Sequence, residues 1–359
     1  MAPYQLSRRG KQTDEEEQVS FLGSDNLSPS RNGYVGRSTK RVSTRYLLVV
    51  LVTAVVLLES TRVALKKDVV SKAPLFTCPD FHPNYADNEG GEDFEDLYAK
   101  VSRNIPKSKK EFLETFREQP FDGNVNTYTF KKQTLLDFKS KHLVPNLKPG
   151  MKIYESAMGI GMNLFMTLEI LQESKNISGI TVYGNEYVRE SVEQAEFVLD
   201  EGVIPSGNQK GVLCAGDSTN LSHVPSNSFD LVYTGYITPR NALDIDDDDK
   251  WTQICEDANQ QDWMAYKLRA IGVQNQEDWF GKWVAEMARI AKPGAPVIAE
   301  EVSQPTCDAP DDWDGVSKSF WYEAAKKNTY DWNIDPDSIE MMDHTRTGTR
   351  YNVFMRKLA

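Results

Sequence analysis

The chain has 359 residues, of which 40% are hydrophobic, and a formal net charge of −12 at pH 7. This length suits one large domain or two small ones, and the hydrophobic content is ordinary for a globular protein. The negative charge argues against a nucleic acid as partner or substrate, because phosphate binding needs a basic surface. We expect no metal, because the four histidines lack metal-ligand spacing: His82, His142, His223 and His344.

The front of the chain predicts a membrane anchor. Residues 1–45 are polar and rich in Ser, Gly and Arg, and we expect a disordered basic tail. Residues 46–58 form an uncharged, mostly apolar run. A helix that spans a membrane needs roughly 20 residues, so the run must be extended to residue 65, and this extension includes Glu59 and Arg62. We favour a single-pass transmembrane signal anchor over 46–65, and a cleaved signal peptide or an organelle-targeting segment are the alternatives.

The flanking charges predict the orientation of this anchor. Five basic residues lie from Arg31 to Arg45, and four lie from Glu59 to Lys72. The small excess favours an N-terminus on the cytoplasmic side, which predicts a type II protein of the ER or Golgi whose remaining chain lies in the lumen. Residues 66–124, with alternating Pro-rich and acidic stretches, are expected to form a stalk and an N-terminal extension.

The cysteines and two glycosylation sequons are compatible with a lumen. An even number of cysteines permits two disulfides, in three pairings, in an oxidising compartment. All four follow the apolar run: Cys78, Cys214, Cys255 and Cys307. Cys214 lies inside a predicted strand, so we expect a buried free thiol there. We expect Cys255 and Cys307 to form a disulfide. The sequons begin at Asn176 and Asn220.

The sequence predicts a helix over 128–142. The segment from Lys152 to Asn163 then predicts a strand, a tight loop of small residues and the start of an apolar helix. Glu155 stands where the strand passes into the loop, at the carboxyl edge of an open α/β sheet, where ligands bind in that architecture. The loop holds Ala157, Gly159 and Gly161. Small residues let a ligand lie against bare backbone, and glycines reach positive φ freely.

Three more predicted strands end in polar residues. The strand 180–183 is followed by Glu186, the strand 211–215 by Asp217, and the strand 229–233 by Thr234 and Gly235. Further along, 277–291 has helical periodicity and stops at a Lys-Pro-Gly turn, a strand follows over 295–299, and two short strands over 338–342 and 350–355 read as a hairpin.

The spacing Glu-x-Ala-x-Gly-x-Gly over 155–161 resembles motif I of the class I S-adenosylmethionine (SAM) methyltransferases, where the first small residue is usually Gly. The Gly-x-Gly-x-x-Gly fingerprint of dinucleotide sites is not met, because its third glycine would fall at Leu164. The resemblance covers residues 125–359, the expected methyltransferase domain. It implies an α/β, Rossmann-like fold: a seven-stranded, mostly parallel sheet with helices on both faces and a C-terminal antiparallel hairpin.

The resemblance also implies roles for single residues. Glu186 would accept from the ribose hydroxyls, Asp217 from the adenine amino group, and the end of the fourth strand would face the methyl group. The residues expected to contact SAM are Glu155, Ala157, Gly159, Gly161, Glu186, Tyr187, Asp217, Ser218, Thr234 and Gly235.

The acceptor is expected to bind an insertion over 236–276, which is rich in aromatic and amide residues. Tyr236 is the first candidate for contact with the acceptor, and His223 is a candidate base. These features together predict a membrane-anchored SAM-dependent methyltransferase that acts on a small-molecule, lipid or glycan acceptor. The alternatives are a SAM-binding scaffold without turnover, an aminopropyl transferase on the same fold, and a dehydrogenase.

Overall fold

A computed structural model describes residues 74–82, 128–200, 202–235, 248–304, 315–343 and 350–359. The expected tail, the anchor over 46–65, most of the expected stalk and Tyr236 lie outside these ranges. None of the helices within them combines the length and the hydropathy that a bilayer span requires.

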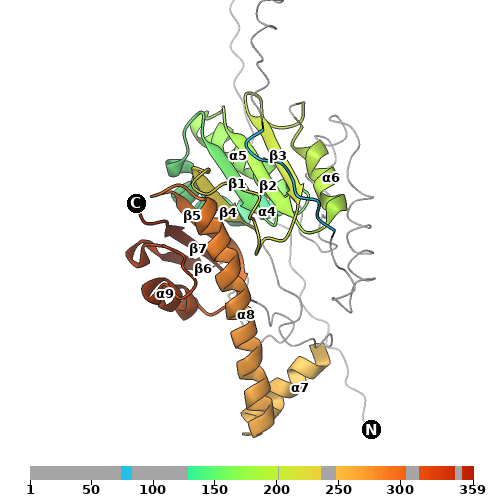
Figure 1. The fold of residues 1–359 in the computed structure, drawn as a ribbon, viewed down its shortest axis with the longest axis vertical. Coiled ribbons are helices and arrows are strands. Elements are labelled where there is room, and N and C mark those ends of the chain that lie inside the picture. The colour runs from blue at the N-terminus through green and yellow to red at the C-terminus, as the bar shows by residue number, and fades with distance from the viewer. Residues whose placement is uncertain (1–73, 83–127, 201, 236–247, 305–314, 344–349) are drawn as a thin grey trace, which may run out of the picture. The chain divides into compact units, whose positions relative to one another are not determined.

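The described residues form a seven-stranded sheet with the strand order β3-β2-β1-β4-β5-β7-β6 (Figure 1). The first five strands pair in parallel, and β7 lies antiparallel between β5 and β6. The strands are β1 Lys152–Ser156, β2 Thr181–Glu186, β3 Gln209–Ala215, β4 Leu231–Thr234, β5 Pro296–Ser303, β6 Glu340–Asp343 and β7 Arg350–Arg356. The α/β fold expected from the sequence, with its mostly parallel sheet and C-terminal antiparallel pair, is confirmed.

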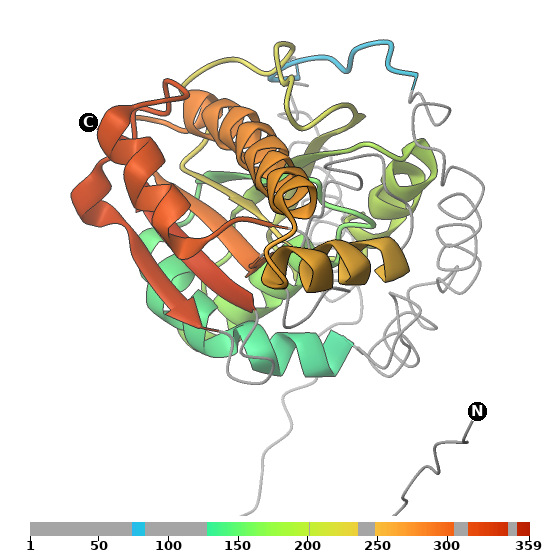
Figure 2. The ribbon, with the colours of Figure 1, turned by 90° about the horizontal axis from the view of Figure 1, so that it is seen from below.

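Helices cover both faces of this sheet (Figure 2). On β1, Ile153 packs into one hydrophobic cluster and Tyr154 into the other, because successive side chains of a strand point to opposite faces. The first cluster includes residues of α4, α5 and α6, and the second includes residues of α8 and α9. These helices are α4 Tyr128–Phe138, α5 Met162–Lys175, α6 Arg189–Val198, α8 Trp263–Ile290 and α9 Lys318–Lys327. The central strands are buried from both sides, as parallel strands between helical layers usually are.

The boundaries of two helices differ from those expected from the sequence. The helix expected over 128–142 is α4 followed by a π-helical turn, Lys139–Leu143. The helix expected to begin at Glu277 begins at Trp263, where the Asp262 side chain accepts a hydrogen bond of 2.8 Å from the Ala265 backbone N–H. The described part of the expected insertion is therefore helical: it consists of α7, Asp248–Asn259, and the first half of α8.

A short segment of the expected stalk packs on the sheet. We call residues 74–82 the strap; it is the blue segment that crosses β3 in Figure 1. Phe76 is buried in the second cluster, with ring centroids 6.0 Å from Tyr183, 5.7 Å from His223 and 6.5 Å from Phe229. The chain between β3 and β4 runs through turns without a helix, so the Phe76 ring packs where a crossover helix would otherwise cover this face.

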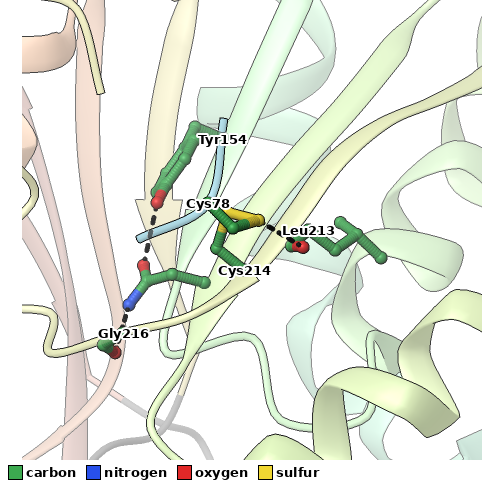
Figure 3. The surroundings of a disulfide bond; sticks show 6 residues. Cys78, Tyr154, Leu213, Cys214 and Gly216 are labelled. Atoms are coloured by element: carbon green, nitrogen blue, oxygen red, sulfur yellow. Dashed lines mark hydrogen bonds between the residues drawn. A yellow bond between two sulfur atoms is a disulfide. The ribbon is translucent and has the colours of Figure 1, made fainter. Parts of the chain in front are cut away.

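The strap is fixed by a disulfide between Cys78 and Cys214 (Figure 3). The expectation of a free thiol at Cys214 was wrong. Cys214 is buried, as expected, but it lies on β3, the edge strand, where the strap crosses the face that lacks a helix. Cys255 is also disulfide-bonded, and its expected partner Cys307 lies outside the described residues.

Candidate cofactor-binding site

The loop after β1 turns in the left-handed region at each of its three small residues. The φ angles are 54° at Ala157, 53° at Gly159 and 79° at Gly161. A Cβ on Gly159 would have no atom within 4 Å, so this side of the loop is open. A Cβ on Gly161 would lie 3.0 Å from Leu199 Cδ1, so this glycine lets α5 begin close to the end of α6. Ala157 keeps the backbone conformation that usually selects glycine.

Glu186, at the end of β2, holds this loop in place. Its Oε2 accepts a hydrogen bond of 2.8 Å from the Gly159 backbone N–H, and its Oε1 accepts from the backbone N–H groups of Tyr187 (2.8 Å) and Val188 (3.2 Å). Burial raises the pKa of Glu186, and the three N–H groups oppose this shift. Because a carboxylate has about four acceptor positions, these bonds leave room for a further donor, such as a ribose hydroxyl.

Asn185, which precedes Glu186, joins the ends of β1, β2 and β3. Its Oδ1 accepts from the Tyr154 hydroxyl (3.1 Å), and its Nδ2 donates to the Gly216 carbonyl oxygen (3.1 Å) and to Ser218 Oγ (3.0 Å). In Figure 3, dashed lines mark the hydrogen bonds that reach Tyr154 and Gly216. The amide thereby places the loop that carries Asp217 beside the end of β2.

Asp217 and Ser218 follow β3 in this loop. Asp217 Oδ1 accepts from the backbone N–H and the hydroxyl of Thr219, each at 2.8 Å. This arrangement is the usual capping of a turn by an aspartate. The predicted contact of Asp217 with an adenine amino group stays a prediction.

A chain of polar side chains, three of them buried and one partly buried, adjoins the loop, and we call it the buried polar chain. Lys139 Nζ donates to Glu300 Oε1 (2.6 Å), and both side chains are fully buried. Asn163 Nδ2 then donates to Glu300 Oε2 (2.8 Å) and to Glu155 Oε1 (2.9 Å). These four side chains connect the π-helical turn after α4 to β5, α5 and β1.

Two acceptor atoms at the end of this chain lack a partner. Glu155 Oε2 and Asn163 Oδ1 are buried, and neither has a hydrogen-bond partner among the described residues. A buried acceptor without a donor costs about 1–3 kcal/mol. Burial raises the pKa of Glu155 well above its usual value, although Asn163 and Lys139 oppose the shift. Two unpartnered acceptors on side chains that are hydrogen-bonded to each other, one of them a carboxylate, suit a cationic N–H donor.

The end of β4 adjoins the same groups. Thr234 is fully buried, and a Cβ on Gly235 would lie 3.3 Å from Asn163 Nδ2 and 3.4 Å from Glu155 Oε1. The glycine thus allows the chain to pass close to the acid. The next residue, Tyr236, lies outside the described residues, so its expected contact with an acceptor stays a prediction.

His223 lies at a different place from Glu155, beneath the strap. Its ring packs against Phe76, and its Cε1 would be 3.7 Å from a Cβ on Gly216. Burial lowers the pKa of His223, and the charge of Arg289 lowers it further. A neutral imidazole has the protonation state of a base, but this ring contacts the strap and not the buried polar chain in the structure.

The predicted site residues therefore fall into two connected groups. The first surrounds the loop after β1, and the second follows β3 and is joined to the first by Asn185.

Sequence reasoning missed Lys139, Asn163, Asn185 and Glu300. The one available signal was a pair of acids, Glu300 and Glu301, inside a strand that is otherwise apolar. Within the described ranges, no group of three or more His, Cys, Asp or Glu residues is arranged to hold a metal ion.

Neither a family model nor a curated protein sequence matches the chain. Solved structures with a similar arrangement include SAM-dependent methyltransferases from Aquifex aeolicus, Leishmania major and Methanosarcina mazei. The first is 13% identical, covers 73% of this chain and 98% of its own, and has a TM-score of 0.36. The second has 12% identity, coverage of 73% and 83%, and a TM-score of 0.38. The third has 15% identity, coverage of 60% and 95%, and a TM-score of 0.36. Likenesses at this level assign no function.

The left-handed residues of the loop give a paired prediction. Ala157→Gly relieves a side chain at positive φ and should raise the free energy of unfolding by about 1 kcal/mol, whereas Gly159→Ala introduces that strain without a clash and should lower it by about 1 kcal/mol. Urea unfolding of the full chain checks both values. Effects of the same sign would contradict the conformation described for this loop.

The buried polar chain gives a second prediction. Lys139→Met leaves Glu300 buried without its cation, and it should lower the free energy of unfolding by about 3–5 kcal/mol. The double variant Lys139→Met/Glu300→Gln should lose less than the sum of the two single variants, because the two residues share one interaction. Lys327→Met, which breaks an exposed ion pair with Glu323, is the control and should leave stability unchanged. Additive losses at 139 and 300 would contradict the pairing.

Proposed function

We propose that this chain is a SAM-dependent methyltransferase. The observation that carries the proposal is the pair of unpartnered, buried acceptors on Glu155 and Asn163, beside a loop that is open at Gly159 and is held by the carboxylate of Glu186. SAM has an α-ammonium group, a cationic sulfonium and a ribose diol. These groups are donors and positive charges, and the site offers acceptors and negative charge.

The chemical roles follow from these positions. SAM supplies an activated methyl group, so the protein has mainly to align the acceptor and exclude water. Glu155 and Asn163 would hold the ammonium end, the open side of the loop would receive the body of the ligand, and Glu186 would hold the ribose. Asp217 and Ser218 would hold the adenine. Thr234 and Gly235, beside Glu155, would face the transferred methyl group.

The same charges disfavour a dinucleotide. A pyrophosphate usually binds at the N-terminus of the helix after the first strand. Here Glu155 and Glu186 both lie at that turn, and two carboxylates there repel phosphate. The replacement of the usual glycine by Ala157 gives the scaffold alternative no support, because Ala157 retains a left-handed φ of 54°. No observation in the described residues favours the aminopropyl transferase.

The acceptor side is proposed from the sequence and from one structural feature. We propose a small-molecule, lipid or glycan acceptor that binds against the insertion over 236–276. Its described part, α7 with the first half of α8, carries the exposed side chains of Trp263, Met264 and Tyr266. Tyr236 remains the first candidate for contact with the acceptor.

The proposed compartment rests on disulfides. Disulfides persist in oxidising compartments and are rare in the cytosol, and both Cys214 and Cys255 are disulfide-bonded. The disulfides support a lumenal domain. From the sequence pattern alone we propose a single-pass, type II protein of the ER or Golgi that is anchored through residues 46–65.

The proposed cofactor is tested by calorimetric titration of the full chain with SAM. The wild type should bind in the micromolar range. Glu155→Gln removes the negative charge and keeps the shape, so it should weaken binding by about tenfold or more. Glu173→Gln, an exposed carboxylate on α5, is the matched control and should bind like the wild type.

Absence of SAM binding by a folded wild-type chain would contradict the cofactor assignment. Equal SAM affinity of Glu155→Gln and the wild type would contradict the role given to Glu155 and would leave the cofactor assignment intact. Methyl transfer from labelled SAM to extract fractions then identifies the class of acceptor.

The proposed compartment predicts glycosylation at Asn176. This residue is exposed at the C-terminal end of α5, and the chain then leads to the start of β2, so Asn176 lies at the edge of the sheet opposite the loop after β1. Endoglycosidase treatment of the chain made in a secretory host should lower its mass, and Asn176→Gln should remove that shift. Asn220, which is three residues from Asp217, is the comparison site. An Asn176 that carries no glycan would contradict the lumenal orientation.

A further inference from the structure

The strap reaches from the edge of the sheet to the end of β2. Its Cys78 is bonded to Cys214 on β3, three residues before Asp217. At its far end, the Phe81 ring packs edge-on against the Tyr187 ring, with centroids 5.3 Å apart and an interplanar angle of 74°. The Arg189 guanidinium donates a hydrogen bond of 2.6 Å to the Phe81 carbonyl oxygen. A disulfide, a ring contact and a hydrogen bond therefore hold the part of the strap from Cys78 to Phe81.

Tyr187 is placed from two directions. It follows Glu186 directly, and its backbone N–H donates to that carboxylate at 2.8 Å. Its ring is contacted by Phe81 from the strap. The backbone of Tyr187 is thus fixed by the group proposed to hold the ribose, and its side chain is fixed by a segment more than 100 residues earlier in the chain.

Phe76 and Phe81, both on the strap, pack in different places. Phe76 is 7% exposed and fills the second hydrophobic cluster together with Tyr183 and Phe229. Phe81 is only partly buried, lies outside both clusters and contacts Tyr187. Phe76 therefore anchors the strap to the fold, and Phe81 lies next to the proposed adenosine end of the site.

We propose that the strap is the outer wall of the adenosine end of the cofactor pocket, that Phe81 positions the Tyr187 ring against the adenine, and that the Cys78–Cys214 disulfide fixes this wall. The inference rests on the proposed function. It makes Phe81 a positioning residue, and it makes cofactor affinity depend on a disulfide that lies outside the loop after β1.

The test compares two phenylalanines of the same strap in the full chain. Phe81→Ala should weaken the binding of SAM and of S-adenosylhomocysteine by the same factor, about five- to tenfold, because both ligands carry the adenosine. Its melting temperature should stay close to that of the wild type. Phe81→Tyr keeps the ring and should restore affinity. Phe76→Ala should lower the melting temperature, and at a temperature where it is folded it should bind SAM within about twofold of the wild type.

The double variant Cys78→Ser/Cys214→Ser tests the disulfide. At a temperature well below its melting temperature, it should bind SAM and S-adenosylhomocysteine at least about fivefold more weakly than the wild type. A wild type that binds SAM while Phe81→Ala binds it equally well would overturn this inference and leave the proposed function intact. Equal losses of affinity in Phe76→Ala and Phe81→Ala would also overturn it, because they would indicate a general effect of the strap on folding. A folded wild type that does not bind SAM would overturn both proposals.

Discussion

The fold around the site depends on the buried ion pair between Lys139 and Glu300. Moving two charges out of water costs several kcal/mol for each ion, and the pair repays this only when its remaining hydrogen-bond positions are filled. Asn163 fills one of them and passes the connection to Glu155. The segment after α4, the strand β5, the helix α5 and the strand β1 thereby meet at one point. That point lies at the carboxyl edge of the central strands, where a ligand would bind in this architecture.

The buried polar chain ends at Glu155 Oε2 and Asn163 Oδ1, which have no hydrogen-bond donor among the described residues. Glu300 pairs directly with the Lys139 ammonium, whereas Glu155 is connected to this pair only through Asn163, and burial raises the pKa of Glu155. A cationic ligand would complete the set by pairing with Glu155 and with the free oxygen of Asn163. The site is thus incomplete without a cation, and this requirement fits SAM better than it fits an anionic dinucleotide. In the proposed arrangement, the strap and its disulfide would close the opposite, adenosine end of the same edge.

The sequence predicted the features that depend on local order along the chain. Strands that run in parallel bring their carboxyl ends to one edge, so Glu155, Glu186 and Asp217 could be grouped from their positions after three apolar runs. Contacts between distant segments could not be predicted in this way: Lys139 and Glu300 are 161 positions apart, and Cys78 and Cys214 are 136 apart. The start of α8 was missed because its first half exposes Trp263 and Tyr266, which removes the one-sided apolar pattern of a packed helix.

The central claim is that Glu155 receives a cation, and the proton balance of binding tests it most directly. In the unliganded fold, burial raises the pKa of Glu155 and favours its protonated form, whereas a bound cation favours the ionised form. SAM binding should therefore release protons, and affinity should rise with pH by at most about tenfold per unit. Calorimetry in two buffers of different ionisation enthalpy measures this release. The account predicts a buffer-dependent heat in the wild type that Glu155→Gln loses. SAM binding whose proton release is the same in both proteins would contradict it.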